Sequence, residues 1–371
     1  LLALEGRPER EVLPLFLPSR DPRVRYHQAQ ALFYLGRLEE ALEVLEAGLP
    51  PHLAWRAEGL KGRILERLGR HGEAALADER GAELALGLGR YWLLLDAAAR
   101  WLEAGEGERA LLALKEAEAA VGEEDPEDAA TRHYLLARAH LLLGNPGLAL
   151  EEIRKALALE EESGHKAYGT PLVEGQALLQ LGRYEEAMAS FREALARADA
   201  GERPHVLHEM GVAALDHGAY PEAEEHLRAL VREEGYPYLA QAYADLAEAL
   251  YRQGRYQEAE AAAREAVARG AVAAGELVLG HVAYDLLHLE EALEHYRKAA
   301  ESAEEGSREW VGAQEMVVDT LAQLGYRFPE EMVRRGQAVL PYLHPADEWH
   351  AALTAYVERA QALLREGKRL N

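Results

Sequence analysis

The stretch LGRYEEAMASFREAL, Leu181–Leu195, decides the fold of this chain. A glycine is followed by a tyrosine, two glutamates and an alanine-rich run, and this order of residue types recurs along the sequence. The repeated position, called the anchor below, is held by Gly36, Gly69, Gly105, Gly144, Gly182, Gly218, Gly254 and Leu287. Successive anchors are 33, 36, 39, 38, 36, 36 and 33 residues apart. Periods in this range are typical of a solenoid built from pairs of helices.

Two other positions of the period are held by small residues. Alanine stands five residues after every anchor: Ala41, Ala74, Ala110, Ala149, Ala187, Ala223, Ala259 and Ala292. Alanine or glycine stands seven residues before every anchor: Ala29, Gly62, Ala98, Ala137, Gly175, Gly211, Ala247 and Gly280. Two antiparallel helices approach closely only where side chains are small, so these positions predict tight helical hairpins. The anchor glycine is expected to end each first helix in a left-handed conformation.

This pattern resembles the tetratricopeptide repeat (TPR) family. The turn tyrosine is present at Tyr184, Tyr220 and Tyr256, and the best-matched stretches are LGRYEEAMASFREAL and QGRYQEAEAAAREAV, Gln253–Val267. Alanine and leucine dominate the composition and β-branched residues do not alternate, which favours an all-α chain. The resemblance implies a right-handed α-solenoid superhelix of about eight to nine TPR-like helical hairpins with terminal capping helices.

The repeats also suggest how the chain is divided. We expect a partial, degenerate repeat at residues 1–21, eight TPR-like repeats at 22–306, a degenerate ninth repeat at 307–345 and a C-terminal capping helix at 346–371. The capping helix has a polar outer face, which the end of a repeat stack needs. Some units exceed the usual TPR length, and we expect their extra residues in the loops GEEDPEDAA, 122–130, and EEESGHKAYGT, 160–170.

Composition and charge narrow the function classes. The 371 residues include 41 Lys and Arg against 65 Asp and Glu, so this acidic protein has a formal net charge of −24. That charge argues against nucleic-acid binding by this chain. No apolar run reaches the roughly 18 residues that a membrane-spanning helix needs, so we expect no membrane insertion and a cytoplasmic location. The excess of Arg over Lys is expected of a GC-rich or thermophilic bacterial source.

Paired carboxylates such as Glu39–Glu40 and Glu185–Glu186 resemble an acid/base site at first sight. Most of them fall at one point of the period, where a second helix begins, so the bland interpretation is a solvated helix start. The chain has no cysteine, phosphate-binding loop or nucleophile elbow. His205 with His208 and His344 with His350 lack a third ligand at a fixed spacing. We expect no enzyme activity, cofactor or metal.

The resemblance implies that the first helix of each pair lines a concave groove that grips a peptide or a partner helix. Carried onto this sequence, the groove residues are Arg23, Tyr26, Gln30, Arg56, Arg63, Trp92, Tyr134 and Arg138. Arginine forms bidentate hydrogen bonds with carboxylates, so one hypothesis is a groove for an acidic or carboxylate-ended segment. The alternative is that these arginines only solubilise the helices or pair with neighbouring glutamates.

The same offsets in the last four units select a polar, histidine-bearing set without net positive charge. Its members are His205, His208, Gln241, Glu248, Tyr251, His281 and Tyr284. No hypothesis about a ligand for this half follows from its residue types alone.

Three roles fit these features. The first is a non-enzymatic protein–protein interaction scaffold. The second is a sensor or regulatory domain excised from a larger transcriptional regulator or signalling ATPase, and the third is a cell-envelope assembly adaptor. The chain begins LLALEGRPER without a methionine, so we expect it to be a piece of a longer protein. The sequence identifies neither the partner nor the oligomeric state.

Overall fold

Every regular element within residues 21–369, the part of the chain that this computed structural model describes, is a helix. The all-α prediction is therefore confirmed. The side chains of residues 22, 23 and 367–369 are outside the description, as are residues 1–20, which hold the predicted N-terminal partial repeat. The described helices fall into two units, called unit 1 and unit 2, which divide between Arg197 and Ala198.

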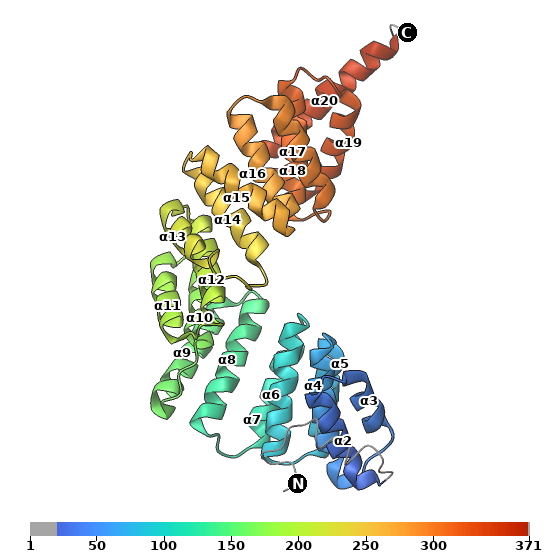
Figure 1. Ribbon diagram of the computed structural model, residues 1–371, viewed down its shortest axis with the longest axis vertical. Coiled ribbons are helices and arrows are strands. Elements are labelled where there is room, and N and C mark those ends of the chain that lie inside the picture. Colours follow the sequence, from blue (N-terminus) through green and yellow to red (C-terminus); the bar gives the residue numbers. More distant parts are fainter. Residues whose placement is uncertain (1–20, 370–371) are drawn as a thin grey trace. The chain divides into compact units, whose positions relative to one another are not determined.

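Unit 1 is a series of helical hairpins that follow one another along the chain (Figure 1). Its elements are α2 (Pro22–Tyr34), α3 (Leu38–Glu46), the 3₁₀ helix η1 (Pro51–Leu53), α4 (Ala54–Arg67), α5 (His71–Leu84), α6 (Leu88–Glu103), α7 (Gly107–Ala120), α8 (Pro126–Leu142), α9 (Pro146–Ser163), α10 (Gly169–Gln180) and α11 (Tyr184–Arg197).

Unit 2 continues the pattern and ends in a single long helix. Its elements are α12 (Arg203–His217), α13 (Tyr220–Leu230), α14 (Leu239–Arg252), α15 (Tyr256–Arg269), α16 (Val272–Asp285), α17 (Leu289–Ser302), α18 (Arg308–Gln323), α19 (Pro329–Val339), the 3₁₀ helix η2 (Leu340–Tyr342) and α20 (Glu348–Arg369). α20 buries Leu353, Val357 and Ala360 along one face.

The hairpin turns depend on backbone conformation at the anchor. All seven anchor glycines have positive φ, between 71° and 82°. At Gly182, the amide of the glycine donates to the carbonyl of Leu179, and the next amide, of Arg183, donates to Leu178; both distances are 2.9 Å. These bonds satisfy carbonyls that the end of a helix leaves without a partner. Leu287 adopts the same conformation, with φ of 62°, and repeats both bonds.

The small residues allow the two helices of a hairpin to touch. A Cβ atom on Gly211 would lie 2.7 Å from the side chain of Leu227, and one on Gly280 would lie 2.5 Å from Tyr296. Leu227 and Tyr296 are fully buried and stand nine residues after their anchors. The absence of a side chain on the first helix therefore leaves a space, and a large side chain of the second helix fills it.

One hairpin replaces this apolar contact with a charge. Asp78 stands nine residues after Gly69, faces Gly62 and is completely buried. Its carboxylate forms an ion pair with Arg100 of α6, which is itself only 4% exposed, and Arg100 also lies 3.3 Å from Glu66. The pair joins two neighbouring hairpins through α5 and α6. A buried charge is tolerated only with such a partner.

The longer units differ from the prediction. The extra residues were expected in loops, but α8 begins at Pro126 and α9 extends to Ser163. Residues 169 and 170 are also helical, because α10 begins at Gly169. The prediction was therefore wrong for residues 126–130, 160–163 and 169–170. Asp125 explains the early start of α8, because its side chain accepts a 3.0 Å hydrogen bond from the amide of Glu127 and caps the helix.

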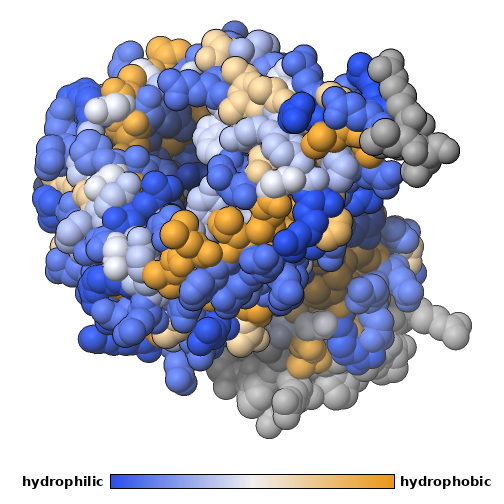
Figure 2. Space-filling model, turned by 90° about the horizontal axis from the view of Figure 1, so that it is seen from above, coloured by the Kyte–Doolittle hydropathy of each residue, from blue (hydrophilic) through white to orange (hydrophobic). Residues whose placement is uncertain are grey.

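Arginine and glutamate also recur together at the start of second helices. Arg183 lies directly after its anchor and forms a two-pronged pair with Glu186, with distances of 2.7 and 2.6 Å. Arg37–Glu40, Arg70–Glu73 and Arg255–Glu258 repeat it. Hydrophilic residues dominate the face in Figure 2, with hydrophobic residues gathered in bands. Within residues 21–369, no helix is long and apolar enough to cross a membrane.

Replacing Leu287 by glycine is expected to stabilise the protein. Leu287 is 79% exposed, so little packing is lost, while its positive φ is strained for a side chain with a Cβ atom. We expect a gain of about 0.5–1 kcal/mol in the free energy of unfolding, measured by urea denaturation. Leu286→Gly is the matched control, because Leu286 has φ of −81°, and it is expected to destabilise. Equal effects of both variants would contradict this account.

Removing one member of the buried ion pair is expected to be costly. Asp78→Ala leaves Arg100 buried without its main counter-charge, and we expect a loss of about 3–5 kcal/mol. The double variant Asp78→Leu, Arg100→Leu should recover most of this loss, because it recreates the contact that Leu227 makes at Gly211. Urea denaturation measures both. A double variant as unstable as Asp78→Ala would show that the ion pair itself is required.

Candidate functional site

The helices that carry the predicted groove residues form the inner layer of each unit. In unit 1, α2 packs on α4, α6 on α8, and α8 on α10. In unit 2, the same holds for α12 with α14, α14 with α16, and α16 with α18. Neighbouring second helices make at most marginal contact within residues 21–369. The first helices thus approach one another more closely than the second helices do, except that α4 and α6 also make at most marginal contact. Their side is the concave side expected of a TPR stack, and the predicted groove residues belong to these first helices.

α2 contributes a hydrogen-bonded polar group. Tyr26 is 9% exposed, and its hydroxyl accepts a hydrogen bond from Gln30 at 3.4 Å. Gln30 also accepts one from Nδ1 of His27 at 3.0 Å in the tautomer that is protonated there. Burial raises the pKa of Tyr26, while the nearby Arg63 and Arg56 lower it. Arg23 belongs to the first turn of α2, but its side chain lies outside the described residues.

α4 carries two arginines that form no ion pair with a described residue. Arg56 and Arg63 are exposed, and neither forms an ion pair with a described carboxylate. The guanidinium of Arg56 lies 5.0 Å from the ring centre of Trp55, and that of Arg63 lies 5.9 Å from the ring centre of Phe33. Contacts of this kind orient a guanidinium and leave its hydrogen-bond donors available to a ligand.

The residues on α6 and α8 are already engaged by carboxylates. Trp92 is 51% exposed, and its indole donates to Asp128 at 3.3 Å. Arg138 donates to Glu103 at 2.7 Å and lies 5.8 Å from the ring centre of Tyr134. Burial raises the pKa of the Tyr134 hydroxyl, against the lowering effect of Arg138. Arg138 therefore follows the alternative interpretation, in which a groove arginine pairs with a neighbouring glutamate.

Residues that the sequence reasoning missed make the groove of unit 1 less basic than expected. Asp96 of α6 has an exposed side chain, yet the pKa of its carboxyl is raised to about 6. The groove walls limit its hydration, Arg63 opposes the shift and Glu66 adds to it. Asp96 stands nine residues before its anchor, outside the offsets used to select the groove. An additional offset could have found it.

Arg138 also borders a cavity of about 570 Å³ on the concave side of unit 1. The other residues that line this cavity are Leu102, Leu141, Leu142, Gln176, Leu179 and Gln180. Leu142 is 48% exposed. The cavity thus combines apolar side chains with amide groups and one guanidinium, a composition suited to a peptide segment.

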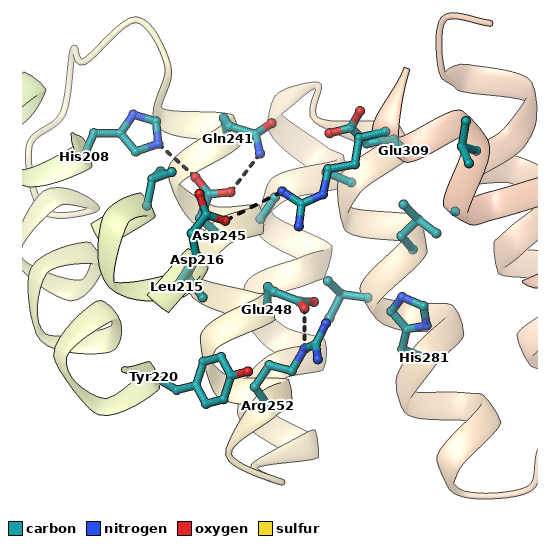
Figure 3. Close-up of a pocket in the computed structure, with 18 of the residues that line it drawn as sticks. His208, Leu215, Asp216, Tyr220, Gln241, Asp245, Glu248, Arg252, His281 and Glu309 are labelled. Carbon is teal, nitrogen blue, oxygen red and sulfur yellow. Dashed lines mark hydrogen bonds and ion pairs between the residues drawn. The ribbon is translucent and has the colours of Figure 1, made fainter. Parts of the chain in front are cut away.

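Unit 2 has a larger cavity, of about 900 Å³, between α12, α14, α16 and the start of α18 (Figure 3). It brings together four members of the polar set: His208, Gln241, Glu248 and His281. Tyr251 stacks on His281 with ring centres 5.5 Å apart but is not in the lining, and the exposed His205 is not in it either. The structure therefore assembles part of the polar set into one site.

Hydrogen bonds fix the histidines of this cavity. Nε2 of His208 lies 2.9 Å from Asp245, and its Nδ1 lies 2.9 Å from the hydroxyl of Tyr236. Asp245 also accepts a hydrogen bond from Gln241 at 2.9 Å. Figure 3 shows His208, Gln241 and Asp245 converging at one end. Both ring nitrogens of His208 are engaged, so the orientation of its ring is fixed.

Comparison with known families agrees with this architecture. One model of the tetratricopeptide repeat matches residues 26–86 and 208–274, and a second matches residues 130–163 and 173–200. Together the matches cover about half of the chain. The chain belongs to the tetratricopeptide repeat family, whose repeats form a protein–protein interaction scaffold. No curated protein matches it by sequence.

Solved structures with the same fold are distant in sequence. The structure of the apo form of RapI is 13% identical in sequence. The match covers 92% of this chain and 98% of the RapI chain, with a TM-score of 0.53. A chain of the APC/C hetero-tetramer Cut9–Hcn1 is 13% identical. The match covers 95% of this chain and 86% of that one, with a TM-score of 0.52. A TPR protein from Parabacteroides merdae is 18% identical, with coverage of 72% and 99% and a TM-score of 0.51. Identities this low show the fold alone.

The raised pKa of Asp96 predicts how its carboxyl titrates. We expect a midpoint near 6 in place of 3.8, followed by NMR of the side-chain carboxyl. Arg63→Gln should raise this pKa further, because the arginine favours the charged form, and Glu66→Gln should lower it.

The same shift links stability to pH. The folded state holds this proton more tightly than the unfolded chain, so the contribution is complete below pH 3.8 and is lost as pH rises through 6. A titration midpoint of Asp96 near 3.8 that is the same in wild type, Arg63→Gln and Glu66→Gln would contradict this description of the groove.

Proposed function

We propose that this TPR protein is a non-enzymatic scaffold whose concave groove in unit 1 binds an acidic or carboxylate-ended segment of a partner protein. The observation that carries the proposal is the pair of exposed arginines on α4, Arg56 and Arg63, which have no ion-pair partner among the described residues. In a chain of net charge −24, most guanidiniums have carboxylates within reach. Two unpaired ones on one concave face favour a negatively charged ligand.

The surroundings of these arginines support an extended segment. The concave helices α2 and α4 place Tyr26 within the electrostatic influence of both guanidiniums, so a phenol lies near the cations. Further along the groove, the cavity beside Arg138 offers apolar and amide groups to the next part of a bound chain. Arg138 contributes less to binding than Arg56 and Arg63, because it already donates a hydrogen bond to Glu103.

A binding experiment with defined peptides tests this proposal. The probe is a fluorescein-labelled peptide, Ala-Glu-Leu-Glu-Leu-Glu-Ala with a free C-terminus, and fluorescence polarisation measures its affinity. Arg56→Gln combined with Arg63→Gln is expected to weaken binding about tenfold or more, because both bidentate donors are lost. Asp96→Asn should strengthen binding, because it removes a carboxylate next to Arg63.

The matched control is Arg37→Gln combined with Arg70→Gln. It removes the same charge, but these arginines pair with Glu40 and Glu73 at the starts of the second helices α3 and α5. Its affinity should stay within about threefold of wild type, as expected for changes far from an interface. Equal loss in both double variants, or no loss in either, would overturn the proposed site.

A further inference from the structure

We infer that the cavity of unit 2 is a second docking site, and that its occupant is an extended protein segment in which cationic side chains alternate with aliphatic ones. The site does not depend on the arginines of unit 1 or on the acidic partner proposed for them. It rests on the scaffold role of the TPR fold and on the charges, apolar lining and dimensions of this cavity.

Charge is the first argument. Five carboxylates line the cavity and only two arginines do so: Asp216, Asp245, Glu248, Glu309 and Glu315 against Arg252 and Arg308. Arg252 pairs with Glu248 at 2.6 Å, whereas Arg308 is 90% exposed and only loosely placed 3.8 Å from Asp216. The lining therefore has an excess of negative charge that the protein does not neutralise within the site.

Two of these carboxylates lie in the first half of α18 and have no described cation paired with them. Glu309 and Glu315 have no ion pair among the described residues, and both are only partly exposed. Limited hydration raises the pKa of Glu315, and the carboxylate of Asp347 adds to the shift. A lysine or arginine of a ligand would offset the repulsion between these carboxylates with an opposite charge. The cost of removing water from the carboxylates would be small, because they are already only partly hydrated.

His281 does not offset the negative charge. Burial lowers the pKa of His281, so its ring is neutral at pH 7, although Glu248 and Asp285 oppose part of this shift and Arg252 adds to it. Nδ1 of His281 lies 2.9 Å from the hydroxyl of Tyr296. In Figure 3 the ring projects toward the same space as Glu248.

The apolar part of the lining favours a ligand with aliphatic side chains. Val212, Leu215, Leu277, Val278 and Val311 come from three helices, α12, α16 and α18, and border the same cavity as the carboxylates. Val212 is 38% exposed, which is unusual for a valine within a helical stack. A purely ionic ligand would leave this surface in water, whereas alternating lysine and leucine would cover both kinds of group.

The dimensions favour a segment over a single residue. A second cavity of about 430 Å³ shares Gln241, Ala274 and Glu309 with the first and continues toward the start of α16 and the connection between α17 and α18. The two adjoining cavities form a groove within unit 2. An extended peptide rises about 3.3 Å per residue, so several residues fit along such a groove.

A defined peptide again provides the test. The probe is fluorescein-labelled Ala-Lys-Leu-Lys-Leu-Lys-Ala with an amidated C-terminus, and the readout is fluorescence polarisation at 0.15 M salt, where long-range attraction is screened. Glu248→Gln, Glu309→Gln and Glu315→Gln together are expected to weaken binding about tenfold or more. The matched control removes three exposed carboxylates of α17 in the second layer, Glu290→Gln, Glu294→Gln and Glu301→Gln, and should change affinity less than about threefold.

A steric variant separates the cavity from general charge attraction. A Cβ on Gly312, which lines the cavity from α18, would meet no atom within 4 Å. Gly312→Leu therefore fills the cavity without changing charge, and leucine suits a helix better than glycine does. We expect it to weaken binding about tenfold as well, while circular dichroism shows a folded protein. Unchanged binding by Gly312→Leu, or equal loss in the α17 control, would overturn the inference.

Two further probes define the occupant. The peptide with glutamate in place of lysine should not bind detectably to this site, so displacement of the lysine peptide by it would contradict the charge argument. Spermine has the cationic groups without the leucines and is expected to bind about tenfold more weakly. Binding of spermine as tight as that of the peptide would make the apolar surface irrelevant and overturn a protein segment as the occupant.

Discussion

The two helices of each hairpin approach one another closely, and this contact determines how the hairpins stack. A side chain at Gly211 or Gly280 would collide with Leu227 or Tyr296, so the first helix yields its volume to the second. Interiors are packed too densely for a Cβ atom to be added there at no cost. This contact fixes the hairpin geometry, which fixes how first helices approach one another and therefore where the concave side lies.

The same constraint explains how a charge came to lie in the core of unit 1. Asp78 stands where other hairpins place a large apolar residue, and Gly62 provides the space. The backbone geometry survives because Arg100 reaches the carboxylate from the neighbouring hairpin. An apolar contact within one hairpin is thus replaced by an ionic contact between two, which couples α5 to α6 more specifically than packing alone does.

The two concave surfaces differ in what is left over after internal pairing. In unit 1, Glu103 and Asp128 engage Arg138 and Trp92, while Arg56 and Arg63 remain unpaired among the described residues. In unit 2, carboxylates exceed arginines around the larger cavity. Recognition depends on these unpaired groups rather than on total charge, because a group that already has a partner must break that contact to bind another.

The all-α class, the TPR hairpins and the turns could be predicted from the sequence alone, because small residues at fixed spacing admit few other packings. Within the described residues, it also placed Tyr26, Gln30, Arg56, Arg63, Trp92, Tyr134 and Arg138 on first helices. Which of these side chains lack an internal partner follows from the packing of neighbouring hairpins. Arg138 meets Glu103, and His208 meets Asp245, across 35 and 37 residues of chain. Such pairs depend on how neighbouring hairpins are stacked and on the reach of long side chains, neither of which leaves a periodic signal in the sequence.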